Sequence, residues 1–243
     1  MMLRAALGFF TRLPIGSAPL PPTFRGVAVW LPVVGLIIGV LVSLALGLAA
    51  QLLPASLCGV IGCLVWVAVT GGLHLDGVAD CGDGLIVEAP PARRLEIMKD
   101  SRLGTFGGAA LFFILALKAA ALGALAGTFP DAFAPLLLSC CLAGTLARCM
   151  VFAAMRVPSA RPGGLGEALH EGVTSRHELI ALAIGLGICA VNGVRGLYAL
   201  AIALLAAYLL LSAAKKRLGG VTGDVFGCLV ELTECVVLIV CCV

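Results

Sequence analysis

Long apolar runs separated by short polar intervals make up most of this chain of 243 residues. An apolar run of about 18 residues or more is long enough for a helix to cross a hydrocarbon core of about 30 Å. The pattern predicts about seven spanning helices, and the short fifth one could merge with the sixth as a re-entrant hairpin at Asn192 and Gly193. The predicted spans are residues 27–53, 55–72, 108–129, 132–155, 179–191, 196–214 and 225–243.

The composition supports a membrane protein, because 61% of the residues are hydrophobic, 12% are charged and the mean hydropathy is +1.15. A soluble domain does not need this much apolar surface. We expect an all-α, polytopic integral membrane helical bundle that forms one domain over residues 1–243. Residues 1–26 are predicted to form an interfacial segment rather than a signal peptide, since Arg12 and Pro14 interrupt the apolar stretch. The two polar segments expected to carry chemistry are residues 73–107 and 217–234.

Basic residues indicate the orientation of the chain. If the N-terminus is cytoplasmic, thirteen of the sixteen lysines and arginines fall at the N-terminus or in loops on that side. This excess agrees with the positive-inside rule, so the N-terminus and the polar segments are predicted to face the cytoplasm. Lys118 and Arg148 fall inside predicted spans, which leaves Arg195 alone on the outer side. The net charge of +3 is too small to indicate a nucleic-acid partner.

Two abundant residue types indicate helix packing rather than chemistry. The eleven cysteines show no CxxC or Cys/His ligand spacing, and nearly all lie in apolar runs, so we expect them to act as small hydrophobic residues. Glycines recur at Gly35 and Gly39 and again at Gly59 and Gly62. Small residues at such spacing allow helix backbones to approach closely.

The stretch from Gly71 to Leu85, GGLHLDGVADCGDGL, carries three aspartates at the end of the second predicted span. In a helix, Asp80 lies about 40° to one side of Asp76 and Asp83 about 20° to the other, so the three carboxylates share one face. Carboxylates this close repel one another, and a divalent cation among them relieves the repulsion. Because the ligands are all oxygens, Mg²⁺ or Mn²⁺ is favoured over zinc.

A basic interval, residues 93–108, follows the aspartates. Arg94 and Arg102 share a helical stripe just ahead of a glycine-flanked helix start, an arrangement that suits phosphate oxygens. A solvated, positive-inside loop that attracts lipid headgroups is the alternative, and the neighbouring aspartates favour the phosphate interpretation. The residues of this interval predicted to contact phosphate are Lys99, Ser101, Arg102 and Thr105.

Two glutamates lie inside the last predicted span, where a charged group costs at least about 2.5–3.5 kcal/mol. Glu231 and Glu234 follow Asp224 within one arc of about 80°. Asp224 is placed to cap this helix, but capping does not explain the two glutamates, which indicate a functional cavity or a metal site. Lys118 and Arg148 in neighbouring spans are expected to be their counter-charges or further phosphate ligands.

The acidic face of the first polar segment and that of the last span could converge around one or two Mg²⁺ ions, with basic residues beside them. This set of groups suits phosphoryl or phosphodiester transfer, in which metal ions neutralise phosphate oxygens and a carboxylate takes the proton of an attacking hydroxyl. A peptidase fits less well, because no GxSxG, HExxH or Cys/His pair is present. A glycosidase uses two carboxylates in a different geometry.

The same residues resemble a known family. The stretch around the three aspartates, MKDSRLGTFGG at residues 98–108, TRLP at residues 11–14, and GGVTGDVFG followed by two glutamates are similar to cobalamin synthase, the adenosylcobinamide-GDP ribazoletransferase family. The likeness runs in order along essentially the whole chain. Where the family usually has Ala-Asp-Thr-Ala-Asp, residues 79–83 read Ala-Asp-Cys-Gly-Asp, so both aspartates are kept and Cys81 replaces a hydroxyl.

The resemblance implies a Mg²⁺-dependent transferase of the cell inner membrane with its active site on the cytoplasmic side. A hydroxyl of α-ribazole, or of its 5′-phosphate, would attack the cobinamide-linked phosphorus of adenosylcobinamide-GDP and release GMP. Association with other cobalamin-assembly enzymes or between copies of the chain is left open. The implied metal ligands are Asp76, Asp80, Asp83, Asp224 and Glu231, with Asp80 or Asp83 also acting as the base. The implied substrate-binding residues are His74, Lys99, Asp100, Ser101, Arg102, Thr105, Arg148, Thr222 and Glu234.

Two other functions remain as alternatives. A cation-coupled transporter would also place acidic residues in spans, but here the acids cluster at one membrane face and no inverted repeat is visible. A lipid-synthesising CDP-alcohol phosphotransferase would also hold metals with spaced aspartates. That family's motif begins with an aspartate pair ahead of Gly and continues through Ala-Arg, whereas Ala79 here is followed by Asp80.

Overall fold

The computed structural model describes residues 2–16, 26–128, 132–161 and 173–243. Within these ranges the regular structure is helical apart from one isolated parallel bridge between Ser159 and Val221, which confirms the all-α prediction. Within the predicted interfacial segment, Met2–Phe10 forms a helix, whereas residues 11–16 are described but not helical. The helices are α1 Met2–Phe10, η1 Ala28–Trp30, α2 Leu31–Ala49, α3 Ala55–Thr70, α4 Leu75–Ile86, α5 Pro91–Ile97, α6 Thr105–Thr128, α7 Phe133–Ala154, α9 Ser175–Val191, α10 Gly193–Leu218 and α11 Gly223–Cys241.

Each of the seven predicted spans coincides with a helix, but fewer are long and apolar enough to cross a membrane alone. Four meet that criterion, or five if α3 and α4, which are bent by 96° at their junction, are counted as one broken span. The 17-residue α9 is joined to α10 by a turn at Asn192 and packs against it, which leaves the hairpin alternative open, and α11 carries three acidic residues. The chain is thus a multi-pass membrane protein, and the count of seven spans stays a prediction. The four helices are Ala28–Ala49, Thr105–Thr128, Phe133–Ala154 and Gly193–Leu218.

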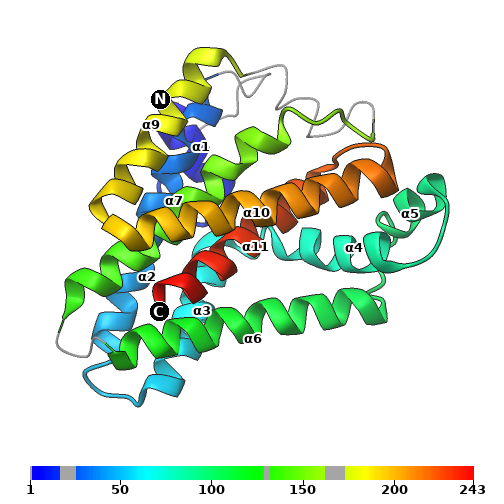
Figure 1. The fold of residues 1–243 in the computed structure, drawn as a ribbon. Coiled ribbons are helices and arrows are strands. Elements are labelled where there is room, and N and C mark those ends of the chain that lie inside the picture. The colour runs from blue at the N-terminus through cyan, green and yellow to red at the C-terminus, as the bar shows by residue number, and fades with distance from the viewer. Residues whose placement is uncertain (1, 17–25, 129–131, 162–172) are drawn as a thin grey trace.

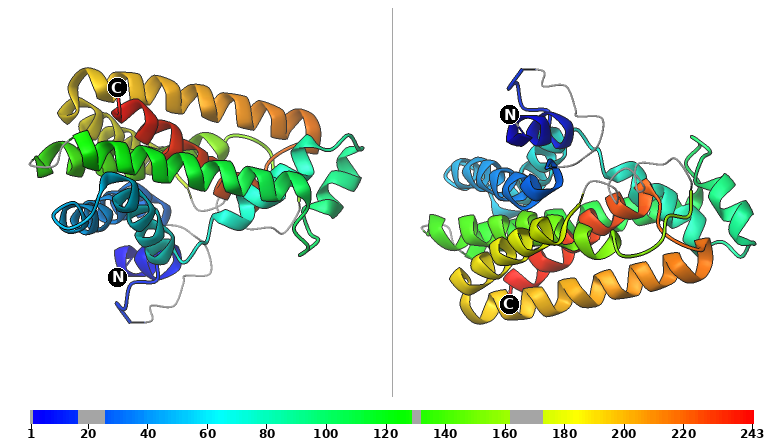
Figure 2. Two further views of the ribbon diagram at one scale, coloured as in Figure 1. Left: turned by 90° about the horizontal axis from the view of Figure 1, so that it is seen from below. Right: turned by 90° about the horizontal axis from the view of Figure 1, so that it is seen from above.

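Helix α11 lies at the centre of the bundle and packs against α4, α6, α7 and α10 (Figure 1). Helices α2 and α3 pack on the other side, α2 against α7 and α3 against α6 (Figure 2). Buried leucines and valines such as Leu229, Val237 and Leu238 hold α11 in place. A helix with three acidic residues is therefore enclosed by four others.

Close helix contacts confirm the packing role predicted for the small residues. Gly35 and Gly39 of α2 face the backbone of α7 at Gly144 and Cys140, and a Cβ at either glycine would collide with it. The eleven cysteines are all free, and most are buried. Both residue types therefore contribute to packing.

The turn between α3 and α4 sets the position of the aspartates. Gly71 and Gly72 have φ values of 65° and 66°, and Gly71 ends α3 in the left-handed conformation that glycine adopts without strain. The chain then turns into α4, which packs against the N-terminal half of α6 and against α11. Asp76, Asp80 and Asp83 are thereby placed on one helix, as the spacing predicts.

Candidate active site

The carboxylate of Asp80 lies in a strongly acidic environment. Burial of the side chain and the negative charges of Asp224, Asp76 and Asp83 act against its ionised form, and the positive charge of Arg161 offsets part of this effect. Asp80 is half-buried, so water screens this repulsion incompletely. Asp80 therefore sits where two acidic segments meet, as the sequence predicts, and the excess negative charge favours a cation.

A glycine brings the two acidic segments together. A Cβ at Gly77 of α4 would collide with the carbonyl of Asp224 and approach the amide of Cys228, so the two helices touch through their backbones at this point. Asp76 and Asp80 flank this contact along α4. The proximity of Asp224 to both therefore depends on the absence of a side chain at Gly77.

The substitution Gly77→Ala tests this contact. We expect it to push α4 away from α11, to lower the free energy of unfolding by about 1–3 kcal/mol and to reduce activity. Unfolding in detergent would measure the loss. Gly187→Ala is the matched control, because a Cβ there has no neighbour within 4 Å and Gly187 lies inside α9. A Gly77→Ala protein as stable and active as the control would contradict the close-approach argument.

The N-terminus of α11 corrects one sequence prediction. Thr222, not Asp224, is the N-cap, and its side chain accepts a hydrogen bond from the amide of Val225. Asp224 lies in the first turn, where its carboxylate accepts hydrogen bonds from Thr222 Oγ1 at 3.2 Å and Arg161 Nη1 at 3.1 Å. The negative charge is well placed at the positive end of the helix dipole. The helix begins at Gly223, so Thr222 occupies the N-cap position. Asp224, one residue inside the helix, lines the cavity.

Sequence reasoning did not select Arg161 as a site residue. Its Nη2 also donates to the carbonyl of Leu95 at 3.0 Å, and its buried Nε has no hydrogen-bond partner among the described residues. This side chain brings positive charge to the two acidic segments. No local motif marks it, because its partner Asp224 is far along the chain.

Asp83 has a different environment from Asp76 and Asp80. Its two carboxylate oxygens accept hydrogen bonds from the amides of Gly104 and Gly107, both at 2.8 Å. These amides belong to the start of α6, whose first N–H groups have no partner within the helix. Asp83 therefore joins α4 to the N-terminus of α6.

The basic interval after α4 is largely engaged in local contacts. Arg94 is buried and donates to the carbonyls of Ala89, Gly84 and Leu85, which fixes the end of α4. Arg102 pairs with Asp100 at 2.6 Å and holds the pKa of that exposed carboxyl at about 2. None of the residues predicted here to bind substrate lines the cavity that lies beside Asp76 and Asp224. These residues are Lys99, Asp100, Ser101, Arg102 and Thr105.

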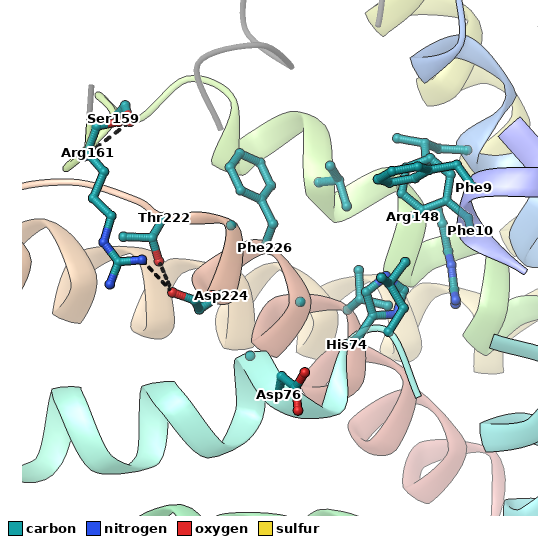
Figure 3. Close-up of a pocket in the computed structure, with 17 residues that line it drawn as sticks. Phe9, Phe10, His74, Asp76, Arg148, Ser159, Arg161, Thr222, Asp224 and Phe226 are labelled. Carbon is teal, nitrogen blue, oxygen red and sulfur yellow. Dashed lines mark hydrogen bonds and ion pairs between the residues drawn. The ribbon is translucent and has the colours of Figure 1, made fainter. Parts of the chain in front are cut away.

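A cavity of about 390 Å³ opens beside the acidic segments (Figure 3). Of the residues predicted to bind metal or substrate, His74, Asp76, Arg148, Thr222 and Asp224 line it. Sequence reasoning missed the aromatic side chains that share the lining. The further lining residues named in Figure 3 are Phe9, Phe10, Ser159, Arg161 and Phe226.

The two glutamates of α11 belong to a buried ion-pair network. Lys118 Nζ lies 2.5 Å from a carboxylate oxygen of Glu231 and 2.5 Å from one of Glu234, and Arg148 pairs with the other oxygen of Glu234. Lys118 also lies 5.0 Å from the ring centre of Trp66. The prediction that Lys118 and Arg148 are the counter-charges is confirmed, and neither glutamate lines the cavity.

The donor groups at the site suit a hard cation. Among the described residues, no three His, Cys, Asp or Glu side chains already lie close enough to hold a metal ion together. Asp76, Asp80 and Asp224 nevertheless supply only oxygens, from adjoining turns of two helices, and the negative charges around Asp80 outweigh the positive charge of Arg161. These are the ligand type and charge that Mg²⁺ prefers. Asp83 is held by two backbone amides and Glu231 by the buried Lys118, whereas Asp224 pairs with the part-buried Arg161 at the cavity.

The fold and the site together define a membrane-embedded helical protein with a cavity, lined in part by Asp76 and Asp224, at the N-terminus of its central helix. The chain belongs to the cobalamin-5-phosphate synthase family, whose family model matches residues 2–242.

Among its relatives, a protein of Pseudomonas aeruginosa is 39% identical over 98% of this chain and 96% of its own length. One of Stutzerimonas stutzeri is 41% identical over the same shares, and one of Escherichia coli is 34% identical over 97% and 96%. All three are named adenosylcobinamide-GDP ribazoletransferase. No solved structure matches the chain.

Proposed function

We propose that this chain transfers the cobinamide-phosphate group of adenosylcobinamide-GDP to a hydroxyl of α-ribazole or its 5′-phosphate. The observation that carries the proposal is the meeting of Asp76, Asp80 and Asp224 beside a cavity, in a chain of this family. The names of the relatives supply the substrates. The products are adenosylcobalamin, or its 5′-phosphate, and GMP.

The transfer exchanges one phosphate ester for another. The ribose oxygen forms a bond to the phosphorus that carries cobinamide, the bond from that phosphorus to the oxygen of GMP breaks, and the hydroxyl proton passes to a carboxylate. Asp80 is the proposed base, because its half-buried carboxylate lies among Asp76, Asp224 and Arg161. Asp83 suits this role less well, since both of its oxygens accept backbone hydrogen bonds.

The remaining residues bind and orient the diphosphate. Arg161 is the proposed phosphate contact, because its Nε lacks a partner while its other nitrogens hold Asp224 and the chain at Leu95. Asp76, Asp80 and Asp224 would hold Mg²⁺, which when bound neutralises phosphate oxygens and stabilises the departing GMP. We place the protein in the cell inner membrane with this site on the cytoplasmic side, as the basic loops suggest.

The test is GMP release by the purified protein. We expect GMP to form only when adenosylcobinamide-GDP and α-ribazole are both present, and to stop when EDTA removes divalent cations. Mg²⁺ added back should restore it. Absence of GMP under all these conditions would reject the transferase, and full activity in EDTA would reject the metal.

A further inference from the structure

Part of the cavity wall is aromatic. Phe9 and Phe10 at the end of α1 face the cavity from one side, and Phe226 in α11 faces it from the other (Figure 3). Phe9 and Phe10 are only partly buried and meet edge to face, with ring centres 4.8 Å apart. A partly exposed aromatic pair beside a cavity offers its ring faces and edges to a flat ligand.

The rest of the lining is mixed in polarity. Leu31, Val151 and Val230 add apolar surface, whereas His74 and Arg148 bring polar groups close to the two phenylalanines (Figure 3). Asp76 and Asp224, two of the proposed metal ligands, lie away from Phe9 and Phe10 in Figure 3. A ligand with a flat apolar end and a hydroxyl-bearing end therefore matches the cavity in one orientation, with its hydroxyls toward the acids.

The size of the cavity limits which part of each substrate can enter it. Ligand clefts usually measure roughly 300–1,000 Å³, so the 390 Å³ found here suits a small molecule of nucleoside size. The corrin ring of adenosylcobinamide-GDP, with its side chains and adenosyl group, is far larger than this space. The cavity can hold α-ribazole, or only the guanosine end of the donor.

We propose that this cavity is the acceptor subsite, in which the planar dimethylbenzimidazole base of α-ribazole packs between Phe10 and Phe226. The assignment rests on the proposed function. Guanine is also a flat base, but its edge carries several hydrogen-bond donors and acceptors, more than the two nitrogens near this wall that lack a partner among the described residues, Arg148 Nη2 and His74 Nδ1, can satisfy. Dimethylbenzimidazole carries two methyl groups and one free ring nitrogen, so the wall favours the acceptor.

The test measures the affinity of the full-length protein in detergent for α-ribazole and, separately, for GMP. We expect Phe10→Leu to weaken α-ribazole binding about fivefold or more, because base stacking on an aromatic ring is lost, and to leave GMP binding unchanged. Phe10→Tyr keeps the ring and should bind α-ribazole as the wild type does. Phe113→Leu is the matched control, since Phe113 forms a similar edge-to-face pair with Phe112 on the exposed surface of α6.

Three outcomes would overturn the assignment. Phe10→Leu could weaken GMP instead of α-ribazole, which would make the cavity the guanosine site. It could change neither affinity, or change α-ribazole binding no more than Phe113→Leu does. The outcomes are separate from a failure of the proposed function, because GMP release by the wild type is measured independently. If the wild type releases GMP but Phe10→Leu binds α-ribazole as tightly as the wild type does, the proposed transferase activity stands and only the subsite is rejected.

Discussion

Replacing Asp80 with asparagine is expected to lower the rate of GMP release by about 100-fold or more, because general-base catalysis typically contributes 10²–10⁴-fold. The amide keeps the size of the side chain but cannot accept the hydroxyl proton. It also removes negative charge from the point where Asp76, Asp80 and Asp224 meet. The measurement is GMP release from adenosylcobinamide-GDP at saturating α-ribazole and Mg²⁺.

Two further variants separate this role from general effects of acidic residues. Glu88→Gln changes an exposed carboxylate just beyond α4 and should leave the rate unchanged. Asp83→Asn should lower stability more than the rate per folded molecule, because Asp83 holds the amides of Gly104 and Gly107. Near-wild-type release by Asp80→Asn, or a larger catalytic loss in Asp83→Asn, would show that the base has been misassigned.

The second large effect is expected from Lys118→Met. Removing one partner of a buried ion pair leaves an uncompensated charge and typically costs about 3–5 kcal/mol. Lys118 is buried and binds Glu231 and Glu234 at once, so its loss leaves two glutamates with Arg148 as the remaining cation in the network. We expect a matching fall in the free energy of unfolding in detergent.

A double variant tests whether these charges act as one network. In Lys118→Met with Glu231→Gln the charges balance again, since Arg148 and Glu234 remain as a pair. This double variant should be more stable than Lys118→Met alone, which is the non-additivity expected of neighbours in one network. Lys216→Met at the exposed end of α10 is the control. Equal destabilisation by the control, or additive losses in the double variant, would contradict a buried network.

Features set by local periodicity or by the cost of buried charge could be predicted from the sequence. In a helix, the 3.6-residue repeat puts Asp76, Asp80 and Asp83 on one face, and the structure places all three in helix α4. A charge inside an apolar span needs an opposite charge nearby, so Lys118 and Arg148 could be matched to the glutamates from their positions within apolar runs. The lengths and positions of the apolar runs likewise predicted where the helices lie.

Features that depend on tertiary packing could not be predicted. Whether Arg102 binds phosphate or its neighbour Asp100 depends on loop geometry, and the structure shows the pair with Asp100. Arg161 meets Asp224 across 63 residues of chain, and nothing local indicates that contact. The aromatic wall exists because α1 folds back onto the bundle, which brings Phe10 to the cavity. The spacing of the aspartates predicted a cation-binding face. It did not predict Arg161 or Phe10, which complete the site.

The central claim is that Asp76, Asp80 and Asp224 form one divalent-cation site, whereas Asp83 and Glu231 hold the structure together. Mn²⁺ binding followed by electron paramagnetic resonance tests it without any turnover. The account predicts that Asp80→Asn and Asp224→Asn lose most of the Mn²⁺ bound by the wild type, and that folded Glu231→Gln retains it. Unchanged Mn²⁺ binding by Asp80→Asn and Asp224→Asn, or its loss in Glu231→Gln, would contradict the account.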